Sequence, residues 1–115
     1  MSAPYDTSPI RATILRHIDG DTTWIAAHLH FDLTLNMTVR WWGLNAPEKS
    51  TPEGKAALAW VEQQMPAGSD VVFQSYRDSK EKFGRFLGEF FVNGVNLNQA
   101  MIAAGFAVPY DGGKR

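Results

Sequence analysis

Residues 11–27 read RATILRHIDGDTTWIAA and predict two neighbouring strands joined by a tight turn. In its first half, from Arg11 to Ile18, β-branched and polar residues alternate with a period of two, which is typical of a half-buried strand. Asp19-Gly20-Asp21 is a turn signal, and the residues from Thr22 to Ala27 predict the returning strand. Three turn residues leave no room for a helix between these two strands.

Patterns further along the chain predict three more strands and two helices. Ser50-Thr51-Pro52-Glu53 indicates a helix start, because it combines a cap, a proline in the first turn and an acidic residue at the positive end. Apolar residues follow at helical spacing until Met65. Asn96 caps a second, shorter helix that ends at Gly105. The further strands are expected at 33–44, 71–76 and 85–92, and one face of the first of them carries Leu33, Leu35, Met37 and Val39.

The predicted order of elements is therefore β-β-β-α-β-β-α. Five short strands with a helix after the third are typical of an OB-fold barrel, whereas a ferredoxin-like fold needs a helix between the first two strands. We expect a β-rich α+β protein, an OB-fold barrel of five strands with two helices. The expected domain spans residues 11–110, between an N-terminal tail (1–10) and a C-terminal tail (111–115).

The composition excludes several kinds of protein. A length of 115 residues fits one domain, and a net charge of −1 argues against a protein that coats nucleic acid non-specifically. Without cysteine the chain has neither a disulfide framework nor a thiolate metal site. No apolar run approaches the roughly 20 residues of a membrane span, and the first residues lack the features of a signal peptide. We expect a cytoplasmic monomer with no membrane and no obligate protein partner.

Three short motifs follow one another at wide spacing: HIDGDT at 17–22, RWWGLNAPE at 40–48 and EKFGR at 81–85. In their order and approximate spacing they resemble the signature segments of the staphylococcal nuclease family. A weaker fourth similarity covers residues 98–107, so the resemblance extends from about Ala12 to Tyr110. It implies a small metal-dependent nuclease built on an OB-fold, in agreement with the fold predicted from the residues.

The resemblance implies a calcium site formed by Asp21, Asn45 and the backbone carbonyl of Ala46, with another divalent ion as the alternative. Calcium takes oxygen ligands of these types. The best-known members have Asp-Thr where this chain has Asn45-Ala46, so one negative charge is lost and we expect weaker or differently tuned binding. Without the resemblance, Asp21 is interpreted as a turn residue that hydrogen-bonds its own backbone, and Asn45 as a loop residue before Ala-Pro.

Glu48 and two arginines are expected to carry the chemistry. The resemblance assigns Glu48 as general base, or as the residue that orients the attacking water, and the preceding Pro47 can fix its direction. Arg40 and Arg85 can bind bidentately the phosphate oxygens that gain negative charge in the transition state. The alternatives are a solvated carboxylate before a helix and two surface arginines in unrelated salt bridges.

Lys82, Phe83 and Tyr110 are the expected substrate-binding residues. Lys82 and Phe83 match the family pair that contacts a terminal phosphate and lies along the nucleotide, although the family usually has Tyr where this chain has Phe83. The ring can still stack on a base, but the hydroxyl is lost. Tyr110 matches a family tyrosine near the base, in a shorter surrounding segment.

Two further features have simpler explanations. His28 and His30 form an HxH pair, but two histidines without a third ligand do not make a zinc site, and we expect them on a hairpin loop. Trp41 and Trp42 are neighbours on a strand, so their side chains point to opposite faces and at most one can stack on a base.

Together these features predict a calcium-dependent phosphodiesterase that acts on DNA, RNA or both. The resemblance implies cleavage of the 5′ P–O bond, which leaves 3′-phosphate ends, and no element for reading base sequence is visible. The alternative is a catalytically silent OB-fold module that binds nucleic acid or protein. The presence of Asp21, Arg40, Glu48 and Arg85 argues against this alternative, and Asn45 argues slightly for it.

Overall fold

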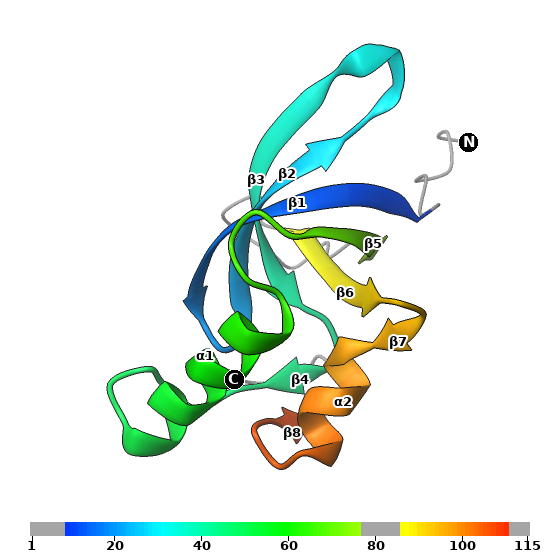
Figure 1. The fold of residues 1–115 in the computed structure, drawn as a ribbon. Coiled ribbons are helices and arrows are strands. Elements are labelled where there is room, and N and C mark those ends of the chain that lie inside the picture. Colours follow the sequence, from blue (N-terminus) through cyan, green and yellow to red (C-terminus); the bar gives the residue numbers. More distant parts are fainter. Residues whose placement is uncertain (1–8, 77–85, 111–115) are drawn as a thin grey trace, which may run out of the picture.

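Five strands form a closed barrel in the computed structural model, which describes residues 9–76 and 86–110 (Figure 1). The strands are β1 (Ile10–Asp19), β2 (Thr22–His28), β3 (Thr34–Trp41), β5 (Asp70–Tyr76) and β6 (Phe86–Val92). Neighbours pair antiparallel in the order β3-β2-β1-β5-β6, and β3 then pairs with β6 in parallel to close the barrel. With the two helices described below, this confirms the predicted β-rich α+β fold and its five-stranded barrel.

The predicted third strand is interrupted before its expected end at residue 44. β3 ends at Trp41, and the chain turns at Gly43, whose φ of 81° is a conformation that favours glycine. The chain then forms β4 (Leu44–Asn45), which pairs with β8 (Val108–Pro109) in a separate two-stranded sheet. A single glycine in an apolar run does not disturb a period-two pattern, so this turn could not be predicted from the sequence. The turn takes the chain after Gly43 out of the barrel wall.

The first helix, α1 (Pro52–Gln64), begins at the predicted cap. The Thr51 hydroxyl accepts a hydrogen bond from the Gly54 N–H group at 3.0 Å. The helix lies against β1 and buries Ala57 and Val61 on that side. Its start could be predicted because a cap is a local signal that does not depend on the rest of the fold.

The second helix, α2 (Leu97–Ala103), follows the short strand β7 (Val95–Asn96) and packs against β6. The Asn96 side chain caps it as predicted, and Leu97 and Met101 are buried. In Figure 1 both helices lie at the same end of the barrel, beside β4 and β8. In the described part of the chain, none of the helices is long and apolar enough to cross a membrane.

Aromatic side chains fill the barrel interior. Trp41, Phe73 and Phe90 are fully buried, and the Phe90 ring centroid lies 4.9 Å from that of Trp41 and 5.3 Å from that of Phe73. A Cβ atom at Gly88 would overlap the Phe73 ring, so the packing requires glycine there. Trp42, in contrast, is 40% exposed, as the alternation along the strand predicted.

The hairpin of β2 and β3 extends well beyond the barrel (Figure 1). Its tip is the short 3-10 turn η1 (His30–Asp32), in which Phe31 has a φ of 61°. Of the apolar residues predicted on one face of β3, only Val39 is fully buried, whereas Leu33 and Leu35 are exposed. The alternation predicts which residues share a face, but it cannot indicate where the hairpin leaves the barrel.

Candidate functional site

The turn between β1 and β2 places the Asp21 carboxylate. The Asp21 N–H group donates to Asp19 Oδ1 at 3.1 Å, and the Asp21 carbonyl accepts from the Trp41 N–H group at 2.9 Å. The side chain that hydrogen-bonds the backbone of the turn is therefore that of Asp19 and not that of Asp21. The Asp21 side chain instead reaches the loop after β4, where Oδ2 accepts from the Ala46 N–H group at 3.1 Å. Asp21 is only 5% exposed.

Gly20 allows this turn to lie close to its surroundings. A Cβ atom at Gly20 would lie 3.0 Å from the Cβ atom of Ala46, 3.1 Å from that of Ala57 in α1 and 3.3 Å from Cε of Met101 in α2. These distances are short for a Cβ atom in a packed interior. The turn therefore packs directly on the loop at Ala46 and on both helices, which fixes where the Asp21 carboxylate lies.

Arg40 lies beside Asp21. The register of β2 and β3 pairs Thr22 with Arg40, and Arg40 Nη2 lies 3.6 Å from Asp21 Oδ2. The Arg40 side chain is 18% exposed and that of Asp21 is 8% exposed, so the pair is largely shielded from water while the guanidinium still reaches the surface. The structure thus brings together three residues of the predicted site: Asp21, Arg40 and Ala46.

The surroundings of Asp21 disfavour its charged form. Burial, a hydrogen bond with the Asp19 side chain and the negative charge of Asp19 raise the pKa of Asp21 from 3.8 to about 6. The Ala46 N–H group and the positive charge of Arg40 act in the opposite direction but do not offset the burial. A cation bound at this carboxylate would relieve the remaining charge imbalance.

The donors near Asp21 fit a hard cation. Asn45 lies in β4, half-buried and paired with Val108, and Ala46 follows it directly. Within residues 9–76 and 86–110, no group of three or more His, Cys, Asp or Glu residues could hold a metal ion. A metal at this place would therefore depend on amide and carbonyl oxygen atoms in addition to carboxylates. Calcium accepts such ligands, whereas zinc favours nitrogen and sulfur.

The start of α1 holds the backbone of Glu48. The Glu48 carbonyl accepts from the Thr51 N–H group at 3.0 Å and from the Thr51 hydroxyl at 2.7 Å. Gly54 faces the same carbonyl so closely that a Cβ atom there would overlap it. The Glu48 side chain is exposed. The structure thus fixes the backbone from which the carboxylate extends, between the Asp21 loop and the helix.

The remaining predicted residues fall in different places. Tyr110 is half-buried, and its N–H group donates to the Gly43 carbonyl at 2.9 Å, which joins the end of the described chain to the turn between β3 and β4. Lys82, Phe83 and Arg85 lie outside the described residues. Their assignment remains the one implied by the motif at 81–85.

Asn98 holds the loop that leads to the site. Its side chain is 1% exposed, accepts from the Phe90 N–H group at 3.1 Å, and donates to the carbonyls of Trp42 at 2.8 Å and Gly88 at 3.0 Å. This side chain therefore links α2 to β6 and to the turn before β4. The sequence placed Asn98 in the fourth similar segment but gave it no role, although a polar residue between Leu97 and Met101 on a buried helix face is the signal that could have indicated one.

An aromatic pair lies on the outer face of the barrel, near Arg40. Cross-strand pairing aligns Arg40 with Leu87 and Leu87 with Tyr76, so these side chains share a face. Trp42 stacks on Tyr76 with ring centroids 4.5 Å apart and an interplanar angle of 23°. The Tyr76 hydroxyl donates to Glu89 Oε1 at 2.6 Å, and this bond raises the pKa of Tyr76 to about 12. The Tyr76 ring, which its hydrogen bond to Glu89 holds in place, thus covers one face of the exposed Trp42 indole.

The two histidines of the HxH pair lie at the base and tip of the projecting hairpin. The His28 ring lies 2.8 Å from the Thr13 hydroxyl, which also donates to Asp70 at 2.8 Å. His30 begins η1 and packs edge-on against Phe31. As predicted, the pair belongs to the hairpin, and it is remote from Asp21, which lies at the other end of β2.

Comparison with known families gives a match over most of this chain. The model described as staphylococcal nuclease homologue matches residues 38–114, about two thirds of the 115 residues. The chain belongs to the staphylococcal nuclease homologue family. A comparison with curated proteins gave no match. In this staphylococcal nuclease homologue the matched segment contains Arg40 but not Asp21, and the fold brings Asp21 to 3.6 Å from Arg40.

Proposed function

We propose that this staphylococcal nuclease homologue is a calcium-dependent nuclease that hydrolyses phosphodiester bonds in DNA, RNA or both. The observation that carries the proposal is the contact between Arg40 and Asp21, 3.6 Å apart and shielded from water. It sets a fixed guanidinium beside a carboxylate whose charge is poorly compensated. The guanidinium can bind a phosphate and the carboxylate can bind a divalent cation. The phosphate and the cation can therefore be held side by side.

Arg40 is proposed to bind the phosphate that is cleaved. A guanidinium donates several N–H groups in a fixed plane and stays charged at any working pH, so it can bind two phosphate oxygens at once. As the phosphorus becomes five-coordinate, these oxygens gain negative charge and the interaction strengthens. Arg85, assigned from the motif at 81–85, is proposed as the second guanidinium.

Glu48 is proposed to orient or deprotonate the attacking water. Its carbonyl is fixed by two hydrogen bonds from Thr51, and its carboxylate extends into solvent, where water is available. A carboxylate in this position can accept a proton from water at neutral pH. Lys82, Phe83 and Tyr110 are proposed to bind the neighbouring nucleotide.

The calcium ion is proposed to be held by Asp21, by Asn45 and by the carbonyl of Ala46. When bound, it would polarise the phosphate and compensate negative charge. The proposed reaction cleaves the 5′ P–O bond and leaves 3′-phosphate ends, with little dependence on base sequence. The domain proposed to carry it spans residues 11–110.

The test is digestion of single-stranded DNA and of RNA by the full chain, with millimolar calcium and with a chelator. We expect cleavage only with the metal, and products that carry a 3′-phosphate by mass spectrometry. Glu48→Gln and Arg40→Lys should each lower the rate by at least about 100-fold. Glu53→Gln is the matched control, because Glu53 is an exposed carboxylate in the first turn of α1 and its loss should leave the rate unchanged.

Absence of metal-dependent cleavage of either substrate would contradict the nuclease proposal. If oligonucleotides then still bind, the silent OB-fold module is the better description. Asn45 is the observation that favours this second function, because it removes one negative charge from the place where the cation is proposed to bind.

A further inference from the structure

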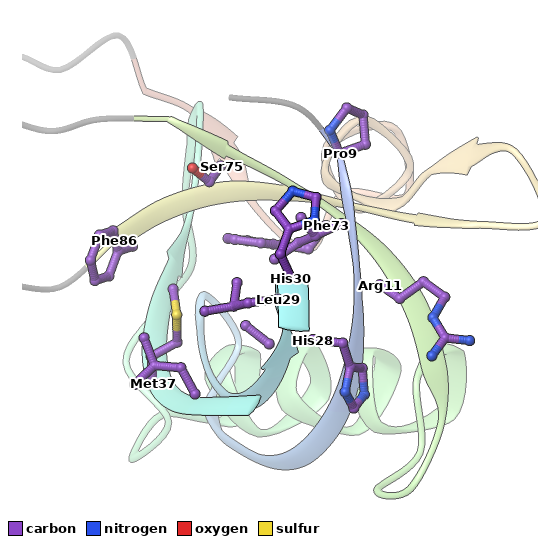
Figure 2. Close-up of a pocket in the computed structure, with 12 residues that line it drawn as sticks. Pro9, Arg11, His28, Leu29, His30, Met37, Phe73, Ser75 and Phe86 are labelled. Atoms are coloured by element: carbon purple, nitrogen blue, oxygen red, sulfur yellow. The ribbon is translucent and has the colours of Figure 1, made fainter. Parts of the chain in front are cut away.

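The projecting hairpin exposes apolar side chains that the barrel does not need. We call residues 28–38 the arm. Within it Leu29, Phe31, Leu33 and Leu35 are 42%, 93%, 60% and 48% exposed. A groove of about 540 Å³ lies at its base, and its lining includes Met37 of the arm and Phe86 of the barrel (Figure 2). Exposed apolar side chains gathered on one segment beside a groove are typical of an interaction site.

The outer edge of the arm directs backbone groups away from β2. Among the described residues, Thr34–Thr38 pairs only with β2, because β6 joins β3 first at Val39. The Trp41 N–H group donates to Asp21, next to β2, whereas the Trp42 N–H group donates to Gly88 in β6. Because backbone groups alternate along a strand, even-numbered residues of β3 direct theirs away from β2. Among the residues that the structure describes, the outward N–H and C=O groups of Thr34 and Asn36 therefore pair with no strand.

This edge lacks the features that prevent strand pairing. Residues 34–38 read TLNMT, with no charge, no proline and no glycine, whereas exposed edges are usually protected by lysine, proline or a bulge. The segment is also nearly symmetric about Asn36: Thr stands on both outer positions, and the apolar Leu35 and Met37 stand on both inner ones. A two-fold axis at Asn36 would therefore set each side chain opposite one of its own kind.

We propose that two copies of this chain pair through their arms, with Thr34–Thr38 antiparallel across a two-fold axis at Asn36. The two Asn36 residues exchange backbone hydrogen bonds, and the Thr38 N–H group of each copy donates to the Thr34 carbonyl of the other. Leu35 of each copy lies beside Met37 of the other, on the face that lines the groove. The exposed Phe31 of each tip reaches toward the base of the other arm.

Charge favours a second copy over other partners. Asp32 is the one charged residue in the arm besides its two histidines, and the arm has no lysine or arginine. A nucleic acid or an anionic membrane would need cations here. An uncharged strand can meet itself, because no like charges face each other across the axis.

The paired arms do not include Asp21 or Arg40 of either copy. The strand β2 runs from the turn at Asp21 toward the tip of the arm (Figure 1), and the paired segment ends at Thr38, two residues before Arg40. The arm is smaller than the roughly 20–30 residues per side of a standard interface, so we expect a dissociation constant of about 10 to about 100 µM. The proposed dimer differs from the monomer expected from the sequence, and the experiment below distinguishes the two.

The test is sedimentation velocity on the full chain from about 1 to about 500 µM, a range that brackets the expected dissociation constant. We expect a reversible monomer–dimer equilibrium. Asn36→Lys and Asn36→Asp each set two like charges at the axis, and each should weaken the dimer at least about tenfold. A mixture of the two variants should restore it, because opposite charges then meet. Gln63→Lys on the exposed face of α1 is the matched control and should dimerise like the parent chain.

A chain that stays monomeric over this range would overturn the proposal, as would Asn36 variants that dimerise as well as the parent. Growth beyond the dimer would overturn it too, because a closed two-fold contact cannot extend. Phe31→Ser gives an independent check: it should weaken the dimer while the circular dichroism spectrum stays unchanged, since the Phe31 side chain is 93% exposed. An unweakened Phe31→Ser dimer would exclude the proposed position of the tip.

Discussion

The Asp21 carboxylate lies between the Ala46 N–H group and the Arg40 guanidinium, and the nearby Asp19 adds a second negative charge. Burial is the largest cause of its raised pKa, and Asp19 adds to it. Above pH 6 the folded protein therefore holds a charge that would be better solvated in the unfolded chain. The residue that we propose as a cation ligand is thus a source of instability when no cation is bound.

Asp21→Asn should stabilise the metal-free protein at neutral pH. The folded-state pKa of about 6 lies above the unfolded value of 3.8, so the contribution of Asp21 is fully present below pH 3.8 and is lost as the pH rises through 6. The variant removes this loss, which amounts to about 3 kcal/mol at most. Urea unfolding with a chelator should show a clear gain at pH 8 and little gain at pH 4. Asp32→Asn, on the exposed tip, is the control, and an equal gain at both pH values would contradict the assigned cause.

Asn45→Asp should tighten calcium binding. The substitution keeps the shape of the side chain and adds a negative charge beside Asp21, which strengthens the attraction for a divalent ion. Calorimetry should show an affinity at least about tenfold higher than that of the parent. Asn93→Asp adds the same charge in the exposed turn after β6 and should leave the affinity unchanged. Unchanged or weaker binding by Asn45→Asp would show that Asn45 is not a ligand.

The start of α1 is the element on which the position of Glu48 depends. Helix propensity alone favours alanine over glycine by about 1 kcal/mol within a helix. At Gly54, however, a Cβ atom would overlap the Glu48 carbonyl, so the helix would have to move away from the Glu48 loop. Glycine here serves the contact between two elements and not the helix itself.

Gly54→Ala should therefore destabilise the protein despite the better helix former. We expect a loss of about 1–3 kcal/mol in the free energy of unfolding, together with a lower cleavage rate, because the Glu48 backbone shifts. Urea unfolding and the digestion assay measure the two effects. The neighbouring Lys55→Ala, on the exposed side of the helix, should change neither. A stabilised Gly54→Ala variant would mean that the loop adapts at little cost.

At the scale of the whole molecule, His17 joins elements from three parts of the fold. Its Nδ1 atom lies 2.9 Å from the Thr23 hydroxyl of β2, and its Nε2 atom lies 2.7 Å from the Met65 carbonyl at the end of α1. The Trp41 indole donates to the same hydroxyl at 3.0 Å. Since that hydroxyl already accepts from Trp41, it can donate to Nδ1, and Nε2–H donates to Met65. The arrangement suits a neutral imidazole.

The effect of His17 on stability has the opposite pH dependence to that of Asp21. A falling pH destabilises the protein through His17, whereas a rising pH destabilises it through Asp21. Burial lowers the pKa of His17 from 6.5, although the Met65 carbonyl and the charge of Glu62 act against it. The unfolded chain takes up the proton first, so the contribution of His17 is present above pH 6.5 and is lost as the pH falls through the folded-state pKa. His17→Gln should flatten the fall in unfolding free energy below pH 6.5, by up to about 1.4 kcal/mol per pH unit. His30→Gln, on the exposed tip, should keep the parent slope, and an unflattened His17→Gln profile would contradict the assignment.

Local sequence patterns were enough to predict the barrel, both helix starts and the chemical types of the candidate site residues. Caps, turns and period-two patterns act over a few residues, so they can be read without the fold. Three features are visible only in the folded chain. Asp19 forms the turn while Asp21 reaches Ala46. The chain turns at a left-handed Gly43 after β3, and the arm leaves the barrel with apolar side chains exposed. Each feature depends on contacts between residues far apart in the chain, and a local sequence pattern cannot predict such contacts.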